Sequence, residues 1–310
     1  MRICLITSRP DHPVLTATTA LLTRHHQVTT IDPEREPEPD PARDPAPARE
    51  VGPEPGPEPG GDGSTGDPAA SGSLADVYLL KARTPRALAL ARSFEERGAP
   101  VLNSAAATAL CQDRTEMAAL ARCAGLPFAA TRTLTSLAAL ADEPDLPYPL
   151  VVKSRHSRRH DLVTRVDGAA RLRELRSAWA QEPVVVQRFR ENSGWDHKLW
   201  VIDGRVFAAL RRSELAEGGR GPTLPLALGD LPDGWQDLAR TVGSVFALEV
   251  YGVDVIDAGD GTPLIVDINA FPGIRGRQGA PEALAALALR TARRSARRSA
   301  RRSAAVGPSV

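Results

Sequence analysis

The sequence predicts an α/β fold in which a β-α-β unit opens the chain and a mixed α+β region follows it. Within residues 2–31, two short apolar runs flank a helix-like segment, a pattern typical of buried parallel strands joined by a helix. Later, two pairs of apolar strands flank the turn sequences Asp203-Gly204 and 259–261, which indicate β-hairpins. A chain of 310 residues is long enough to hold these parts as two or three domains.

The opening unit comprises a strand at 2–7, a helix at 14–23 and a strand at 27–31. The connection between the first strand and the helix, residues 8–13, contains no glycine. A dinucleotide-binding fingerprint needs glycines there to bring the backbone close to the pyrophosphate. That kind of site is therefore not expected.

Two segments are expected to lack folded structure. Residues 33–73 consist mostly of Pro, Glu, Gly and Asp, with few apolar side chains to offset the entropy of ordering, and indicate a disordered insert. Residues 291–310 contain the repeat Ala-Arg-Arg-Ser and are expected to be a basic disordered tail that makes weak contacts with polyanions.

The other elements follow from apolar runs and from helix start and stop signals. Asn103-Ser104 and Asp113 are suited to begin helices, and Gly98 and Gly125 to end them. The expected strands lie at 75–80, 101–102, 148–153, 183–189, 195–202, 205–212, 251–257 and 263–269. The expected helices lie at 86–97, 113–125, 172–179, 236–247 and 281–290, and a further helix is expected to begin after Asn103-Ser104.

The composition indicates in which cellular compartment the protein is expected. The formal net charge is +1, and the three cysteines, Cys4, Cys111 and Cys123, stand far apart without metal-ligand spacing, which favours reduced thiols and a cytoplasmic location. No apolar run is long enough to span a bilayer, so no membrane contact is expected. Whether the chain forms a homo-oligomer is left open.

The strands at 251–257 and 263–269 carry acidic side chains in apolar surroundings. Asp267 and Asn269 share one face of their strand because side chains alternate, and Asp254 on the partner strand can lie opposite them. Two carboxylates and an amide oxygen are hard ligands that suit Mg²⁺ bound together with nucleotide phosphates. Pro272-Gly273 ends the strand directly beyond these ligands.

A group of basic residues lies at the end of the apolar strand at 148–153 and in the loop that follows it. Lys153 ends this strand, where a cation is costly unless it meets an anion. Residues 154–161 contain three arginines and two histidines and no glycine, which is suited to binding several phosphate or carboxylate charges. A solvated basic loop is the alternative. The substrate-binding candidates in this loop are Arg155, Arg158, Arg159 and His160.

These motifs resemble a known family. Gly252-Val253-Asp254-Val255, followed by residues 266–273, is similar to the metal-binding end of ATP-grasp domains, above all the RimK-like ligases, and also to the inositol-polyphosphate kinases. The resemblance implies an ATP-grasp fold of two subdomains preceded by a small Rossmann-like domain. The expected boundaries are 1–108 for that first domain, 109–190 and 191–290 for the two subdomains, and 291–310 for the tail.

The resemblance also implies roles for individual residues. Arg114, Lys153 and Lys198 would contact ATP phosphates, and Lys198 and Arg211 would serve catalysis. The strand end at 187–189 would contact the adenine edge, and Arg212 would face the substrate. The nucleotide-binding candidates are Arg114, Lys153, Gln187, Arg188, Phe189 and Lys198.

The sequence departs from the ligase pattern at four places. Asp267 stands where the ligases usually carry Glu, Lys198 where Arg is commoner, and Arg114 where many have Lys. The loop at 154–161 lacks the usual glycines. Asp at 267 and a histidine in this loop, with His160 as its nearest counterpart, also occur in the inositol kinases.

The implied activity is that of a carboxylate–amine ligase that uses ATP and Mg²⁺, with Mn²⁺ as an alternative. Such an enzyme phosphorylates a carboxylate, and an amine then displaces the phosphate to form an amide. The implied partners are a small-molecule or peptide carboxylate and an amine. The alternative is a phosphotransferase that acts on a polyphosphorylated alcohol such as an inositol phosphate.

Overall fold

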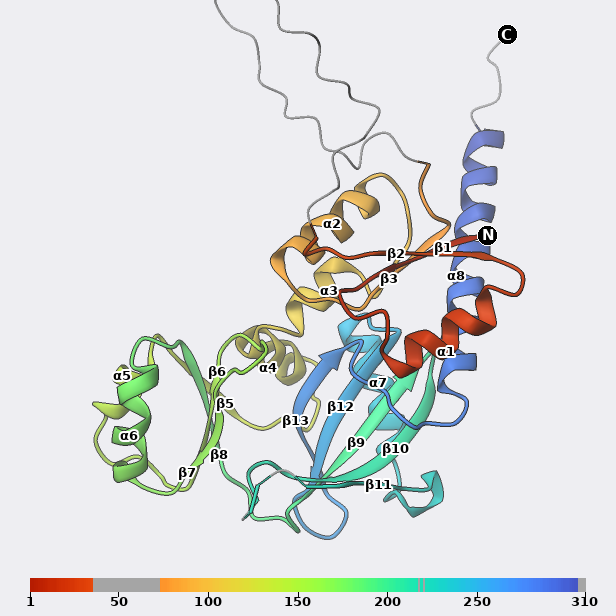
Figure 1. Ribbon diagram of the computed structural model, residues 1–310. Coiled ribbons are helices and arrows are strands. Elements are labelled where there is room, and N and C mark those ends of the chain that lie inside the picture. The colour runs from red at the N-terminus through yellow and green to blue at the C-terminus, as the bar shows by residue number, and fades with distance from the viewer. Residues whose placement is uncertain (36–72, 217, 220, 306–310) are drawn as a thin grey trace, which may run out of the picture.

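The structure is a computed structural model that describes residues 1–35, 73–216, 218–219 and 221–305 (Figure 1). The described chain forms helices and three separate sheets, which confirms the predicted mixed α/β class. The expected disorder of the insert at 33–73 concerns mainly residues 36–72, which lie outside the described residues, as do 306–310 of the tail.

The first sheet, called the N-terminal sheet, is parallel with the order β2-β1-β3-β4. Its strands alternate buried side chains between two helical layers, with α1 and α8 on one face and α2 and α3 on the other. Thr84 caps α2 by accepting a hydrogen bond from the backbone of Ala87, and Pro85 follows it in the first turn. The elements are β1 (Arg2–Ile6), α1 (Pro13–Leu22), β2 (Gln27–Ile31), β3 (Val77–Leu80), α2 (Pro85–Glu96), β4 (Val101–Leu102) and α3 (Ala105–Leu110).

The middle sheet is antiparallel, with the order β5-β8-β6-β7, and forms the lobe at the left of Figure 1. Two helices, α5 and α6, cover one of its faces with leucines. The helix α4 connects this lobe to the preceding domain. The elements are α4 (Arg114–Cys123), β5 (Thr131–Leu134), α5 (Leu137–Ala141), β6 (Leu150–Ser154), β7 (Val163–Val166), α6 (Ala169–Trp179) and β8 (Val184–Arg188).

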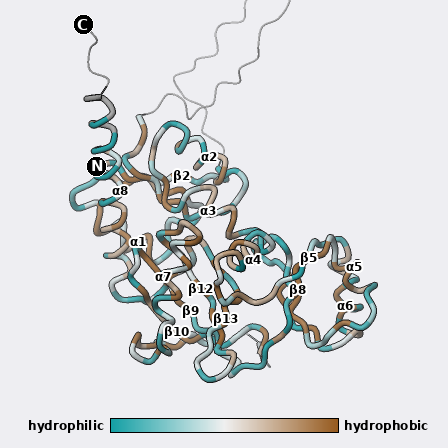
Figure 2. Tube along the Cα trace, turned by 180° about the vertical axis from the view of Figure 1, so that it is seen from behind, coloured by the Kyte–Doolittle hydropathy of each residue, from teal (hydrophilic) through white to brown (hydrophobic). Residues whose placement is uncertain are grey.

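The large sheet is also antiparallel, with the order β11-β10-β9-β12-β13. Both predicted hairpins are present, and Asp203 and Gly204 each have positive φ, as the turn requires. Figure 2 shows α7 lying across β9, β10 and β12, where its buried Trp235 and Phe246 join the core. The elements are β9 (Trp195–Ile202), β10 (Arg205–Arg212), β11 (Thr223–Pro225), a 3₁₀ turn (Leu228–Asp230), α7 (Trp235–Phe246), β12 (Val250–Asp257), β13 (Pro263–Ala270) and α8 (Ala280–Ala305).

The last helix corrects one expectation. Residues 291–305 were expected to be disordered, but α8 continues through them to Ala305. Alanine and arginine are strong helix formers, so a repeat of them extends a helix that packing has already begun. Thr291 and Ala292 are still buried, and Arg290 pairs with Asp203. Within the described ranges, no helix combines the length and the hydropathy needed to cross a bilayer.

The buried side-chain amide of Asn103, which follows β4, forms hydrogen bonds between the N-terminal sheet and the large sheet. The side chain of Asn103 donates from Nδ2 to the carbonyl of Val250 at 2.6 Å. Its Oδ1 accepts from the backbone nitrogens of Glu249 and Val250 at 2.8 and 3.0 Å. These bonds satisfy the backbone at the start of β12, the strand that carries Asp254.

We expect Asn103→Ala to lower the free energy of unfolding by about 2 to 4 kcal/mol, because it leaves buried backbone groups without partners. Urea denaturation monitored by tryptophan fluorescence measures the change. The matched control is Gln236→Ala, which removes an exposed amide that donates to the carbonyl of Leu228. That variant should stay within about 0.5 kcal/mol of the wild type. Equal effects of the two variants would contradict the role assigned to Asn103.

Candidate functional site

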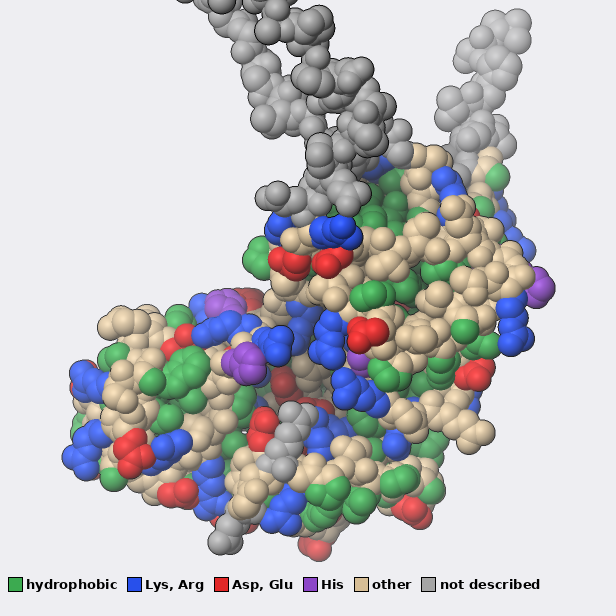
Figure 3. Space-filling view, in the orientation of Figure 1, with side chains coloured by type: hydrophobic (Ala, Val, Ile, Leu, Met, Phe, Trp, Pro, Cys, Tyr) green, Lys and Arg blue, Asp and Glu red, His purple; other side chains and the backbone are tan. Residues whose placement is uncertain are grey.

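A cavity of about 1540 Å³ lies between the middle sheet and the large sheet. Figure 3 shows it as a hollow bordered by blue Lys and Arg side chains. Twelve of its described lining residues are Lys or Arg, and six are Asp or Glu. The chain as a whole has a net charge of only +1, so the cavity concentrates positive charge and favours anionic ligands.

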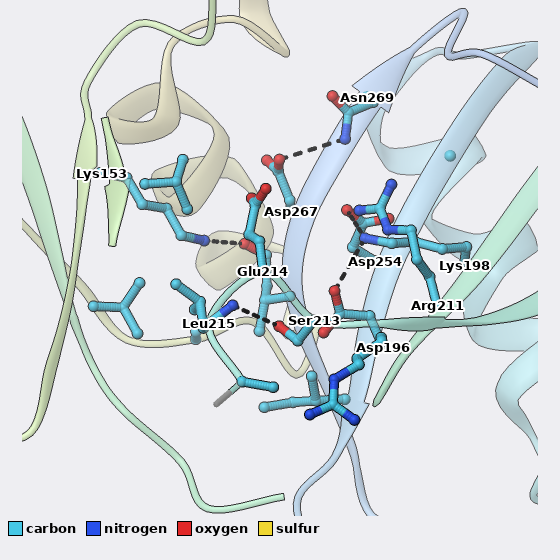
Figure 4. Close-up of a pocket in the computed structure, with 18 of the residues that line it drawn as sticks. Lys153, Asp196, Lys198, Arg211, Ser213, Glu214, Leu215, Asp254, Asp267 and Asn269 are labelled. Carbon is cyan, nitrogen blue, oxygen red and sulfur yellow. Dashed lines mark hydrogen bonds and ion pairs between the residues drawn. The ribbon is translucent and has the colours of Figure 1, made fainter. Parts of the chain in front are cut away.

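A row of three charged side chains crosses the cavity floor. Asp254 on β12 lies opposite Lys198 on β9 and opposite Asp267 on β13. The Nζ of Lys198 is 2.6 Å from a carboxylate oxygen of Asp254 and 3.4 Å from one of Asp196 (Figure 4). The register of three neighbouring strands therefore places one cation and two carboxylates side by side, as cross-strand pairs.

A β-bulge allows β13 to present these groups. The register shifts so that Asp254 is paired with Asp267 and Val255 with Ile265, which leaves Val266 as the extra residue. Both Val266 and Asp267 therefore line the cavity, while Ile265 and Ile268 point into the core on the other face. With strict alternation, Ile265 and Asp267 would share a face, and one of them would be misplaced.

The predicted metal ligands lie together at this point. Asn269 follows Asp267 on the same face, and its Nδ2 is 3.4 Å from the Asp267 carboxylate. Two carboxylates and an amide, all lining the cavity, match the oxygen ligands that Mg²⁺ prefers, so the residues fit the ion. No group of three or more His, Cys, Asp or Glu side chains arranged to hold a metal occurs among the described residues, and the amide oxygen is thus a necessary part of this set.

Lys153 faces this row from the middle sheet. It is buried, and its Nζ donates to the carbonyl of Val266 at 2.8 Å. Burial lowers the pKa of Lys153, and the charge of Asp267 opposes that shift. Its hydrogen bond goes to a neutral carbonyl and not to a carboxylate, so a bound anion would supply a stronger partner.

Arg114, the first residue of α4, also points into the cavity. Its Nη1 donates to Asp161 at 2.7 Å and to the carbonyl of Ser154 at 2.8 Å, and its Nη2 is 3.9 Å from Asp267. The Nε is buried without a hydrogen-bond partner. Arg114 therefore joins the end of β6 to the row of charges on the large sheet.

The strand end at 187–189 lines another part of the cavity. Gln187 is buried and donates to Thr131, Arg188 is exposed, and the ring of Phe189 lies under the guanidinium of Arg165. The backbone nitrogen of Phe189 already donates to Pro149. Contact of this strand end with adenine stays a prediction.

Arg211 and Arg212 close the cavity at the end of β10. Arg211 lies opposite Asp196 in the strand register, and its Nε is buried without a hydrogen-bond partner. Figure 4 shows Arg211 next to Lys198 and Asp254. Arg212 also lines the cavity. The predicted catalytic pair Lys198 and Arg211 thus lies in one place, while the roles themselves stay predictions.

The basic loop at 154–161 makes several contacts within the chain. Arg155 forms a bidentate pair with Asp113, the residue that caps α4, and Arg159 donates to His160. Arg155, Arg159 and His160 are not among the described residues that line the cavity, and their contact with substrate stays a prediction. Arg158 does line it, although its guanidinium is paired with Glu182 at 2.7 Å. Carboxylates distant in sequence thus pair with two of the three arginines of the loop, Arg155 and Arg158.

Sequence reasoning missed several lining residues. Glu214 follows β10, and Figure 4 shows its carboxylate between Lys153 and Asp267. No motif or period marked it. Arg275 lies two residues beyond the recognised Pro272-Gly273, so extending that motif by two residues would have found it. The remaining missed cations are Arg83, Arg165, Arg190 and Arg277.

Comparison with known proteins identifies the class. The solved structure of the RimK domain protein ATP-grasp from Sphaerobacter thermophilus superposes with a TM-score of 0.66 at 20% identity, over 93% of this chain and 99% of that one. The ATP-grasp ligase PsnB complexed with minimal precursor, Mg and ADP gives 0.60 at 19% identity, over 94% and 98%. The described chain therefore has an ATP-grasp fold.

The family follows from sequence. The RimK-like ATP-grasp domain family matches residues 127–283, half of the chain, and the chain belongs to this family. A probable alpha-L-glutamate ligase from Aeromonas salmonicida is 28% identical over 210 residues, which cover 62% of this chain and 67% of that protein. The predicted family, fold and enzyme class, an ATP-dependent ligase, are confirmed.

Proposed function

We propose that this protein is a carboxylate–amine ligase that uses ATP and Mg²⁺ and forms an amide through an acyl phosphate. The observation that carries the proposal is the row of Lys198, Asp254 and Asp267, with Asn269 beside it and Lys153 facing it across one cavity. Cations and metal-binding oxygens then surround a single point where a phosphoryl group can be transferred.

The acidic and amide side chains and the basic side chains would have different roles. Asp254, Asp267 and Asn269 would hold Mg²⁺, which supplies charge neutralisation at the transferred phosphoryl group when it is bound. Lys153, Lys198 and Arg211 neutralise the remaining phosphate oxygens, and they are held in place before the substrate arrives. Gln187 and Phe189 border the part of the cavity assigned to adenine.

The reaction needs no nucleophilic side chain. An oxygen of the acceptor carboxylate attacks the γ-phosphorus of ATP, and ADP leaves with the bond's electron pair. The amine nitrogen then attacks the acyl carbon, inorganic phosphate leaves, and the amine loses a proton. Side chains are required to align the groups and to stabilise the negative charge.

The acceptor would be a small-molecule or peptide carboxylate. The similar PsnB structure, which holds a minimal precursor, supports a larger acceptor as one alternative. The volume of about 1540 Å³ leaves room for a second ligand beside a nucleotide, because a site for one small molecule usually measures about 300–1,000 Å³.

A phosphotransferase acting on a polyphosphorylated alcohol is the second candidate. The excess of cations over carboxylates in the cavity favours it, as does Asp at position 267. In that case the γ-phosphoryl group would move to a hydroxyl oxygen and stay there as an ester.

The products separate the two candidates. We expect incubation with ATP, Mg²⁺, a panel of acids and a panel of amines to give ADP and phosphate in equal amounts, together with an amide detected by mass spectrometry. Hydroxylamine in place of the amine should yield a hydroxamate, because it traps an acyl phosphate. ADP without free phosphate, together with a stable phosphate ester from inositol phosphates, would instead establish the kinase.

A further inference from the structure

A second group of cations lies where the N-terminal sheet meets the chain beyond β13. We call Arg9, Lys81, Arg83 and Arg275 the junction cluster. Arg83 and Arg275 line the cavity. Lys81 donates from Nζ to the carbonyls of Phe271 and Pro272 at 3.0 and 2.9 Å.

The cluster has no carboxylate to balance it. Among the described residues, none of its four cations is within 4.0 Å of an Asp or Glu oxygen, whereas Arg114, Arg155, Arg158 and Lys198 all have such partners. The Arg275 side chain donates no hydrogen bond within the described chain. Burial, together with the charges of Arg83, Arg9 and Arg275, lowers the pKa of Lys81 to about 8.

A buried histidine next to the cluster is also without a partner. His12 is 6% exposed, and neither ring nitrogen makes a hydrogen bond. Its Nε2 lies 3.3 Å from the point where a Cβ would stand on Gly273, a residue that lines the cavity. Burial, followed by the charges of Lys81, Arg275 and Arg9, lowers the pKa of His12 to about 4, against the opposing charge of Asp11. The site thus holds a neutral polar ring among cations.

The position of the junction cluster suits binding of the acceptor better than binding of ATP. The groups assigned to the phosphates are Lys153, Lys198, Arg211 and the metal ligands. Lys81 holds Phe271 and Pro272, and Pro272 is three residues beyond the metal ligand Asn269. Three residues of chain span at most about 10 Å, so a molecule of moderate size can reach from the reaction centre to the cluster.

We infer that the acceptor carries a second anionic group besides the carboxylate that reacts, and that the junction cluster binds it. This inference rests on the proposed ligase function and names its substrate class. A guanidinium pairs with a carboxylate or a phosphate through two parallel hydrogen bonds, and Arg83 and Arg275 present such groups to the cavity.

The test uses matched probes on the full chain saturated with Mg²⁺ and ADP. N-acetylglutamate and N-acetylglutamine differ by one negative charge at nearly the same shape, and N-acetyl-O-phosphoserine and N-acetylserine form the phosphate arm. We expect calorimetry to show at least about tenfold tighter binding of the more highly charged member of one pair or both, the gain from one charged hydrogen bond. The arm with the larger ratio identifies the anion.

The variant Arg83→Gln with Arg275→Gln should remove this ratio and leave the affinity for Mg²⁺-ADP unchanged. The control Arg92→Gln alters an exposed arginine on α2 and should keep the ratio. Equal binding within both pairs, no binding of any charged probe at millimolar concentration, or a ratio that survives the double variant would each overturn the inference.

Proton uptake gives an independent readout. An anion bound beside Lys81 raises its pKa, so binding at pH 8 should take up roughly half a proton or less, measured in two buffers of different ionisation enthalpy. No proton change at pH 8 would argue that the anion binds elsewhere. If the probes bind as expected but no acid and amine give an amide, the proposed function fails while the anion site stands.

Discussion

Replacement of Asp267 by asparagine is expected to reduce ATP turnover at saturating Mg²⁺ by about 10²- to 10³-fold, the usual loss when one transition-state charge contact is removed. The carboxylate stands opposite Asp254 and beside Asn269, and it lines the cavity that Lys153 faces. Asparagine keeps the size of the side chain and removes its charge, so the fold should remain. The truncation Asp267→Ala should abolish turnover altogether.

Kinetics over a range of Mg²⁺ concentrations, with a thermal melt for each variant, provide the measurement. The matched control is Asp260→Asn, in the turn of the same hairpin, where the residue is exposed and has positive φ, which asparagine tolerates. Its turnover should equal that of the wild type. Turnover of Asp267→Ala near the wild-type level would rule out Asp267 as a metal ligand.

The second large effect is expected from Lys153→Met, which should lower turnover by at least about 10²-fold and yet leave the thermal midpoint equal or higher. The Nζ is buried, and burial already lowers its pKa, so the folded state bears the cost of a desolvated cation. Methionine fills a similar volume without that cost. The Val266 carbonyl loses its donor, but it faces the cavity and can bind water there.

The comparison is with Arg132→Met on β5 of the same sheet, an exposed cation that pairs with Glu143. That change should leave turnover intact and alter the midpoint only slightly. A Lys153→Met variant that melts far below the wild type would show that the lysine stabilises the fold. A variant with normal turnover would remove Lys153 from the phosphate site.

Most of the fold was predictable because its signals are local. The turn Asp203-Gly204 determines its hairpin within a few residues, and apolar runs mark most strands of the three sheets. The short strands β5, β7 and β11 were not predicted, because they are partly exposed and lack a continuous apolar run. The continuation of α8 was missed because composition was taken as evidence of disorder. Its repeat has high helix propensity, and the packed first half of the helix supplies the nucleus.

From the residue pattern alone, the metal ligands were predictable because they are neighbours in one hairpin. The resemblance to ATP-grasp domains was needed to select Arg114, Lys198 and Arg211, which line the same cavity. The alternation of β13 brings Asp267 and Asn269 to one face, and the turn at 259–261 returns β12 beside them. The ion pairs of the basic loop were not foreseen because the counter-charges, Asp113 and Glu182, lie 42 and 24 residues from Arg155 and Arg158. Glu214 and Arg83 reach the cavity through tertiary packing, which no local pattern records.

The bulge at Val266 has a consequence for the role of the extra residue in this strand. In an ordinary strand, gaining or losing one residue turns every later side chain to the opposite face. Here β13 already contains one extra residue, Val266, at the bulge. Losing Val266 would therefore leave Ile265 facing the core and Asp267 facing the cavity. The loss would remove the carbonyl that receives Lys153. The extra residue in β13 therefore serves the contact with Lys153 and is not needed to keep Asp267 on the cavity face.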